Sequence, residues 1–267
     1  MFSLFFKLKS DMSKLAFHVF IIVMPSFLWA QDSANILEIP ELKSFVTIHQ
    51  ISNGGKTIEY TATAKETYLK DEHGEPVASV WSVAYTQNNT NPISKPVTFV
   101  FNGGPGSASV WLHFGMFGPE LVKVSSDAVA DDGAAPYNLT KNDKGLLDLT
   151  DLVFIDPVGT GYSRVLGKGK VEDYWGLNED AESISKFMRQ WITENNRWYS
   201  PKYIAGESFG TTRAVAVAHV LEGNGQNMAL NGLILISQAL DYDGSTSIPN
   251  NITSFLTYLP SCCCHAW

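Results

Sequence analysis

A serine set between two glycines is the feature of this sequence best suited to chemistry. Residues 206–210 read Gly-Glu-Ser-Phe-Gly and match the pattern G-x-S-x-G. In a nucleophile elbow of this pattern, the serine sits on a sharp turn between a strand and a helix, with its hydroxyl clear of the sheet. A Cβ at either flanking glycine would crowd neighbouring backbone or forbid the turn. Ser208 is therefore a candidate nucleophile for acyl transfer.

Such a serine also needs hydrogen-bond donors for the oxyanion that forms when it attacks a carbonyl group. One donor is the backbone N–H of the residue after the nucleophile, here Phe209. The second comes from a loop that follows an earlier strand, and the Asn-Gly-Gly-Pro-Gly segment at 102–106 is the natural candidate. Gly103 and Gly104 have no side chain, so their N–H groups can face a substrate. The alternative interpretation is that these glycines only make a turn.

The base and its orienting acid should follow Ser208 along the chain, the acid first. After the elbow, the only histidines are His219 and His265. His219 stands on the expected helix roughly 15 Å along the axis from the serine, which is too far to act as its base. A triad of Ser208, Asp241 or Asp243, and His265 is a weak alternative, because a parallel crossover unit needs about 30 residues.

Other histidines and the cysteines suggest neither a base nor a metal site. His49, His73 and His113 precede the nucleophile and are interpreted as surface or loop residues. The cysteines are adjacent at 262–264 and lack the spacing of a metal site. We expect no metal and no other cofactor.

The elements that must position Ser208 follow a recognisable order. Residues 44–87 alternate in hydrophobicity and predict antiparallel strands. Beyond them, continuous apolar runs alternate with helical patterns, which indicates a parallel sheet covered on both faces. The predicted apolar strands are 97–101, 151–155, 202–205 and 233–236, and the predicted helices are 173–195 and 211–221. Several of these strands end in glycine-rich loops at the carboxyl edge, where open α/β sheets build their sites.

Three motifs in this order resemble one known family. Phe-Asn-Gly-Gly-Pro-Gly-Ser-Ala-Ser at 101–109, Asp-Pro-Val-Gly-Thr-Gly-Tyr-Ser at 156–163 and the elbow at 206–210 are together similar to the serine carboxypeptidases. The resemblance covers roughly residues 44–267. It implies the α/β-hydrolase fold, with a mostly parallel sheet preceded by antiparallel N-terminal strands.

The resemblance also implies roles for individual residues. Ser208 would form the acyl-enzyme, Gly104 and Phe209 would supply the oxyanion donors, and Asn102, Gly103 and Glu207 would bind the substrate. In the family, the residues at the positions of Asn102 and Glu207 grip the C-terminal carboxylate of a peptide. Two bare carboxylates repel, so Glu207 and the substrate would share a proton, and we expect activity to be highest in acid.

Some positions depart from the usual family pattern. Phe209 replaces a common tyrosine, which matters little because the donor is backbone. Val100 stands where tryptophan is frequent, and Met116 where a second carboxylate-site glutamate is sometimes found. Ser107 replaces a disulfide cysteine of many eukaryotic members, which favours a bacterial-type protein.

Family members run to nearly twice this length, and their acid and base lie in the part that would follow. We therefore expect an N-terminal fragment, with residues 31–244 forming the first part of the hydrolase domain and 245–267 the start of a cap insertion. Such a fragment should be inactive because Ser208 has no base. It should also aggregate, because strand 233–236 would be an open apolar edge.

The N-terminus resembles an export signal. Lysines at 7, 9 and 14 precede an apolar run at 15–30 that ends at Ala30 and is short for a membrane span. Residues 1–30 are thus predicted to be a signal peptide, with a retained membrane anchor as the alternative. Because the region 31–261 has no cysteine, a periplasmic or extracellular location is favoured over a eukaryotic secretory route.

Composition narrows the function classes. The 267 residues are 45% hydrophobic and 17% charged, with a net charge of −8 and no basic run, so nucleic-acid binding is excluded. The leading hypothesis is a serine-type carboxypeptidase acting on peptides with a free C-terminal carboxylate. The alternatives are an acyltransferase or esterase on the same scaffold, and a non-catalytic remnant that binds carboxylates.

Overall fold

The computed structural model describes residues 39–123, 138–223, 226–239 and 251–252, all within the compact unit Ile39–Trp267. Several sequence predictions fall outside these residues. They are the signal peptide at 1–30, most of the cap segment 245–267, and the alternative triad residues Asp241, Asp243 and His265.

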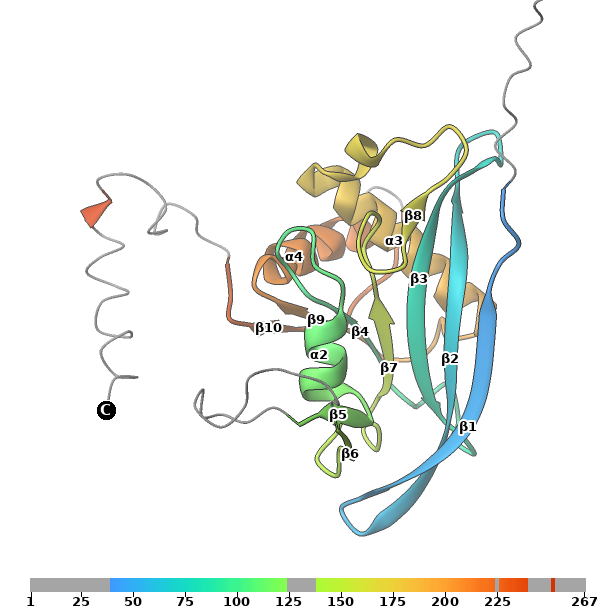
Figure 1. Ribbon diagram of the computed structural model, residues 1–267, viewed down its shortest axis with the longest axis vertical. Coiled ribbons are helices and arrows are strands. Elements are labelled where there is room, and N and C mark those ends of the chain that lie inside the picture. Colours follow the sequence, from blue (N-terminus) through green and yellow to red (C-terminus); the bar gives the residue numbers. More distant parts are fainter. Residues whose placement is uncertain (1–38, 124–137, 224–225, 240–250, 253–267) are drawn as a thin grey trace, which may run out of the picture. The chain divides into compact units, whose positions relative to one another are not determined.

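A mixed sheet forms the centre of this unit (Figure 1). In sheet order its strands are β1 (Ser44–Asn53), β2 (Lys56–Lys70), β3 (Pro76–Gln87), β7 (Asp151–Ile155), β4 (Val97–Phe101), β9 (Lys202–Glu207) and β10 (Gly232–Ile236). The pairs from β1 to β7 are antiparallel, and those from β7 through β4 and β9 to β10 are parallel. The predicted change from antiparallel to parallel strands is confirmed.

Shorter elements flank this sheet. Strand β8 (Arg164–Val165) pairs with β3, and β5 (Glu120–Val122) pairs with β6 (Leu139–Lys141) in a separate two-stranded sheet. The helical segments are α2 (Val110–Leu112), a π-helical turn η2 (His113–Phe117), a 3₁₀ turn η3 (Val171–Tyr174), α3 (Leu177–Glu194) and α4 (Phe209–Glu222). The helix predicted at 173–195 therefore begins later than expected, because a separate 3₁₀ turn occupies its first residues.

The two faces of the parallel strands are covered by different elements (Figure 1). Every residue of β4 and β7 is buried, and alternate side chains point to opposite faces. Phe99 packs under α3 and α4, and its ring meets that of Trp191 edge-on at 5.5 Å. Val100 points the other way, toward Leu112 of α2. The continuous apolar runs in the sequence thus reflect strands buried on both faces.

The outermost strands of the described sheet expose apolar side chains. In β10, which pairs only with β9 among the described strands, Leu233, Ile234 and Leu235 keep 36–37% of their surface accessible. On β1, Phe45 and Ile48 are more exposed still. Among the described strands β10 is thus an outermost strand with partly exposed apolar side chains, and the predicted open edge and its aggregation stay predictions.

Candidate active site

Ser208 occupies the turn between β9 and α4 with a backbone conformation that side chains rarely adopt. Its φ of 56° and ψ of −126° lift the residue out of both elements. A Cβ on Gly206 would lie 2.1 Å from the carbonyl oxygen of Gly210, and one on Gly210 would lie 3.0 Å from that of Asn102. The turn therefore admits glycine alone at Gly206 and favours it at Gly210, which explains the spacing of the motif.

The Asn-Gly-Gly-Pro-Gly loop lies directly against this elbow. A Cβ added to Gly103 would meet the backbone nitrogen of Phe209 at 2.5 Å and the carbonyl oxygen of Glu207 at 2.6 Å. Gly104 has a φ of 104°, in the region that favours glycine. The segments that carry Gly104 and Phe209 are therefore adjacent, as two donors to one oxyanion would have to be.

Asn102 and Glu207 are also brought together. Asn102 is fully buried, and its Nδ2 donates a hydrogen bond to Oε2 of Glu207 over 3.0 Å. Its Oδ1 accepts a hydrogen bond from the backbone N–H of Leu112 at 3.0 Å. That second bond fixes which end of the amide faces the glutamate, so the amide presents a donor to carboxylate oxygens beside the elbow.

A buried ion pair that sequence reasoning missed lies beneath both segments. The Nε of Arg213 donates to Oδ2 of Asp180 over 2.6 Å, and its Nη1 donates to the carbonyl oxygen of Asn102 over 2.6 Å. Burial raises the pKa of Asp180, against the opposing effect of the Arg213 guanidinium. The available signal was a single arginine in an Ala- and Val-rich helix, one turn after Phe209.

The second family motif forms a braced turn after β7. Asp156 accepts a hydrogen bond from the backbone N–H of Ser109 at 2.9 Å and a longer one from that of Tyr162 at 3.3 Å. Burial raises the pKa of Asp156. A Cβ on Gly161 would overlap the same carboxylate, which explains why that position is glycine. This motif therefore ties the turn to the residues that follow β4.

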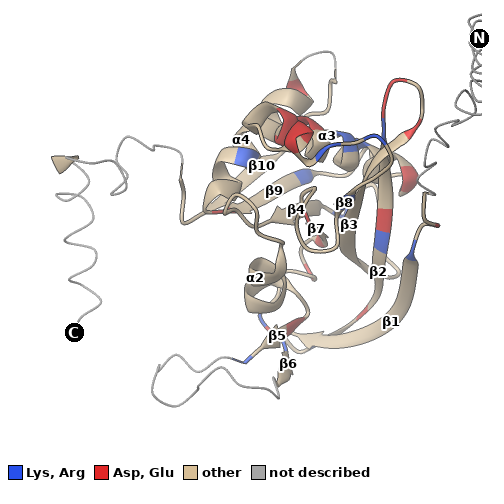
Figure 2. Ribbon diagram, turned by 45° about the horizontal axis from the view of Figure 1, so that its top comes forward, with Lys and Arg blue, Asp and Glu red and all other residues tan. Residues whose placement is uncertain are grey.

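The loop and the short helix that follow β4 carry no charged side chain. Residues 97–119 contain no Lys, Arg, Asp or Glu, and α2 is accordingly tan in Figure 2, whereas α3 carries many charged residues. A cleft of about 270 Å³ opens beside Phe209. It is lined by Pro105, Gly106, Pro157, Val158, Gly159, Thr160, Tyr174, Trp175, Asp180, Phe209 and Arg213.

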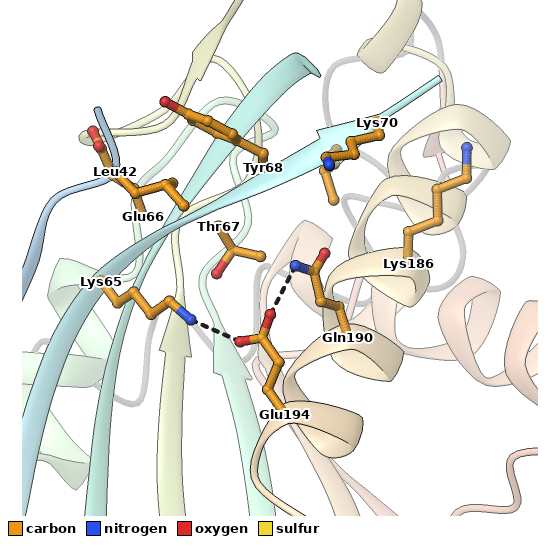
Figure 3. Close-up of a pocket in the computed structure, with 10 residues that line it drawn as sticks. Leu42, Lys65, Glu66, Thr67, Tyr68, Lys70, Lys186, Gln190 and Glu194 are labelled. Carbon is orange, nitrogen blue, oxygen red and sulfur yellow. Dashed lines mark hydrogen bonds and ion pairs between the residues drawn. The ribbon is translucent and has the colours of Figure 1, made fainter. Parts of the chain in front are cut away.

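A cleft of about 500 Å³ lies elsewhere, between β2 and α3 (Figure 3). Its lining includes Lys65, whose Nζ contacts Oε2 of Glu194 at 2.7 Å, and Gln190, which donates to the other oxygen of that carboxylate at 2.9 Å. Ser208 and the residues predicted to act with it do not line this cleft. Its greater volume is therefore not evidence that the reaction takes place there.

The histidines that the structure describes do not serve Ser208. His219 is exposed on α4, as expected, and no hydrogen bond joins Ser208 Oγ to any described residue. The interpretation of His113 as a surface or loop residue is wrong. It is only 7% exposed, stacks on Phe154 at 4.2 Å, and its Nε2 lies 2.7 Å from the hydroxyl of Tyr85. Burial lowers the pKa of His113 to about 4, so the ring is neutral at pH 7.

A family model for serine carboxypeptidases matches residues 66–258 of the chain. The chain belongs to the serine carboxypeptidase family. Among curated relatives, serine carboxypeptidase-like 16 of Arabidopsis thaliana is 28% identical over 166 residues, which are 60% of this chain and 37% of that protein. Serine carboxypeptidase-like 51 of the same plant is 31% identical over 147 residues, 52% of this chain and 29% of that protein.

A solved structure supports the fold. A prohormone-processing carboxypeptidase from Saccharomyces cerevisiae superposes with a TM-score of 0.54 at 22% identity, covering 77% of this chain and 42% of that one. The predicted α/β-hydrolase fold is thereby confirmed. The chain thus spans well under half the length of each of these relatives.

The described residues include neither a membrane-spanning helix nor a metal-ligating cluster. Within that part of the chain, no helix combines the length and apolarity needed to cross a bilayer. The same residues contain no group of three or more His, Cys, Asp or Glu side chains placed to hold a metal ion.

Proposed function

We propose that this family member is a serine carboxypeptidase that releases C-terminal residues from peptides through an acyl-enzyme on Ser208. The observation that carries the proposal is the pairing of a strained serine elbow with the Asn102–Glu207 hydrogen bond at its side. An elbow alone would suit many acyl transfers. An amide donor and a carboxyl group beside it suit a substrate whose scissile bond lies next to a free carboxylate.

In the proposed reaction, Ser208 Oγ attacks the carbonyl carbon of the last peptide bond and gives its proton to a base. The backbone N–H groups of Gly104 and Phe209 stabilise the resulting oxyanion. Collapse expels the C-terminal amino acid as an amine that takes up the proton, and water then hydrolyses the ester on Ser208. Asn102 donates a hydrogen bond to the departing carboxylate, and Glu207 would share a proton with it because two bare carboxylates repel, so we expect activity to be highest in acid.

The base is the part of this mechanism that the described residues do not supply. We therefore expect the 267-residue polypeptide by itself to release no C-terminal residue, and a longer form carrying an acid and a histidine to be active. Two samples should be assayed for release of the last residue of a blocked dipeptide. They are the 267-residue polypeptide and the protein as isolated from its source, called the native protein below. Release by the polypeptide that Ser208→Ala abolishes would contradict this expectation.

Labelling with a fluorophosphonate tests the nucleophile separately from the substrate. In the native protein, Ser208→Ala should abolish labelling, while the matched control Ser107→Ala in the adjoining loop should keep it. Labelling with turnover of an acyl ester but no blocked dipeptide would favour an esterase or acyltransferase instead. A native protein whose Ser208 stays unlabelled would favour a carboxylate-binding remnant.

We also propose that the protein is exported, on the strength of the lysines and the apolar run within residues 1–30. The N-terminal sequence of the native protein tests this. A mature chain that begins near Gln31 would support signal cleavage, and an uncleaved one would contradict it.

A further inference from the structure

Arg213 contacts both segments that would form the oxyanion site. It stands four residues after Phe209 on α4, so both side chains lie on one face of the helix. The guanidinium carbon lies 5.3 Å from the centre of the Phe209 ring and 5.4 Å from that of Phe101. The planar cation is thus in contact with an aromatic ring from the elbow and with one from the end of β4.

The polar contacts of Arg213 complete this connection. Its Nη1 donates to the carbonyl oxygen of Asn102, which belongs to the peptide unit leading into Gly103. Its Nε is held by Asp180 from α3. Because a peptide unit is planar, fixing the Asn102 carbonyl also fixes the direction of the Gly103 N–H. Arg213 therefore orients the start of the loop on which Gly104 lies.

Both charges are removed from water: Arg213 is 2% exposed and Asp180 is 6% exposed. A pair of apolar residues of similar size would often be as stable as a buried ion pair, so stability alone is a weak reason for this arrangement. A guanidinium supplies what an apolar side chain cannot, namely directed donors to a carbonyl group and a carboxylate at once.

We propose that Arg213 is a positioning residue, oriented by Asp180, that holds the loop of Asn102 and the elbow of Ser208 in one fixed relation. Its importance for catalysis rests on the proposed oxyanion roles of Gly104 and Phe209. Its effect on the loop does not rest on them and can be measured separately, by hydrogen exchange.

The test compares two swaps of the same chemistry. Arg213→Met with Asp180→Leu removes both charges near the elbow. Arg197→Met with Asp151→Leu does the same at a second buried pair, in which Nη1 of Arg197 lies 2.5 Å from Oδ2 of Asp151. This pair lies at the amino ends of the parallel strands, opposite the elbow. Arg213→Lys and Arg197→Lys form a second matched set that keeps the charge and loses the planar fork.

Amide hydrogen exchange is followed in peptides spanning 102–112 and 206–211. We expect both to exchange about tenfold faster in the Arg213 variants, as for the loss of a hydrogen bond of about 1.4 kcal/mol, and to be unchanged in the Arg197 variants. Unchanged exchange in the Arg213 variants, or an equal change in both sets, would overturn the proposal. If the double variants do not fold, the lysine variants decide.

Fluorophosphonate labelling of the native protein separates this inference from the proposed function. If Ser208 is the nucleophile, its labelling should be about tenfold slower in Arg213→Lys and unchanged in Arg197→Lys. Labelling that is equally fast in both would contradict the positioning role. Labelling that persists in Ser208→Ala would instead contradict the proposed function, and the exchange measurement would still decide the role of Arg213.

Discussion

The two ends of the parallel strands use the same pair of residue types for different purposes. At the amino ends of β4, β7 and β9, Arg197 contacts Asp151 and donates to the carbonyl oxygens of Lys95 and Pro96. Beyond the carboxyl ends, Arg213 contacts Asp180 and the carbonyl group of Asn102. Both arginines are almost fully buried.

What differs is the surroundings of each pair. At the amino edge, the second oxygen of Asp151 accepts a hydrogen bond from the backbone N–H of Gln87, the last residue of β3, so this network joins the ends of neighbouring strands. At the carboxyl edge, Asp180 and Arg213 line the cleft beside Phe209. A buried ion pair can thus serve the sheet at one edge and the loops of the candidate site at the other.

The largest effect is expected at the amino edge. Arg197→Met leaves the carboxylate of Asp151, whose side chain is 2% exposed, buried without its cation. Breaking a buried pair in this way costs about 3–5 kcal/mol, which should appear as a lower free energy of unfolding in urea. Exchange in residues 102–112 should stay as in the wild type once global unfolding is accounted for. Faster exchange in these residues would show that the pair at the amino edge also orders the loop at the carboxyl edge, and the two pairs would then not differ in purpose.

Acid should lower the stability of the folded protein through His113, which lies on the carboxyl side of the sheet. Its pKa is lowered by burial to about 4, from an ordinary value of 6.5. The unfolded chain therefore takes up a proton as pH falls through about 6.5, while the folded protein resists until about 4. The contribution of His113 to the free energy of unfolding is therefore complete above pH 6.5 and falls by about 3 kcal/mol by pH 4.

The pH dependence of unfolding in urea measures this effect. His113→Gln, which keeps a polar group beside Tyr85, should be less stable at neutral pH and should lose less stability on acidification. Asp156 and Asp180, whose pKa values are raised by burial, act in the opposite direction in both proteins, so they cancel in the comparison. An equal acid loss in wild type and variant would contradict the assignment to His113.

The sequence predicted the strands well because burial on both faces leaves an unmistakable apolar run. The ranges expected for β4 and β7 match the observed bounds, and Ile184, Phe187 and Met188 lie buried at helical spacing on α3. The resemblance to the serine carboxypeptidases implied that Asn102 and Glu207 act together, and the structure joins them by a hydrogen bond.

What the sequence could not show depends on partners distant along the chain. Arg213 and Asp180 are 33 residues apart and look like ordinary helical charges until α3 and α4 pack together. His113 has no neighbour in the sequence that reveals its stacking on Phe154. Burial of a polar residue follows from tertiary packing, which spacing along one element does not encode.

A smaller effect is expected where the loop meets the elbow. Gly103→Ala would place a Cβ 2.5 Å from the nitrogen of Phe209, against backbone that cannot turn away. Overpacking of this kind costs about 1–3 kcal/mol and should also slow labelling of Ser208 in the native protein. Gly115→Ala is the matched control, because its Cβ would meet nothing within 4 Å. Equal effects of the two substitutions would show that the contact is looser than described.

The smallest effect is expected from an ion pair that stays in water. Lys65 and Glu194 are joined at 2.7 Å across the cleft of Figure 3, but their side chains remain 34% and 39% exposed. Such pairs contribute about 0–1 kcal/mol, because solvent screens them and ordering two long side chains opposes them. Lys65→Met should therefore change the free energy of unfolding far less than Arg197→Met, and added salt should reduce the difference further. A loss as large as that of Arg197→Met would mean that burial does not determine how much these pairs stabilise the protein, and the contrast between the two strand edges would then need another cause.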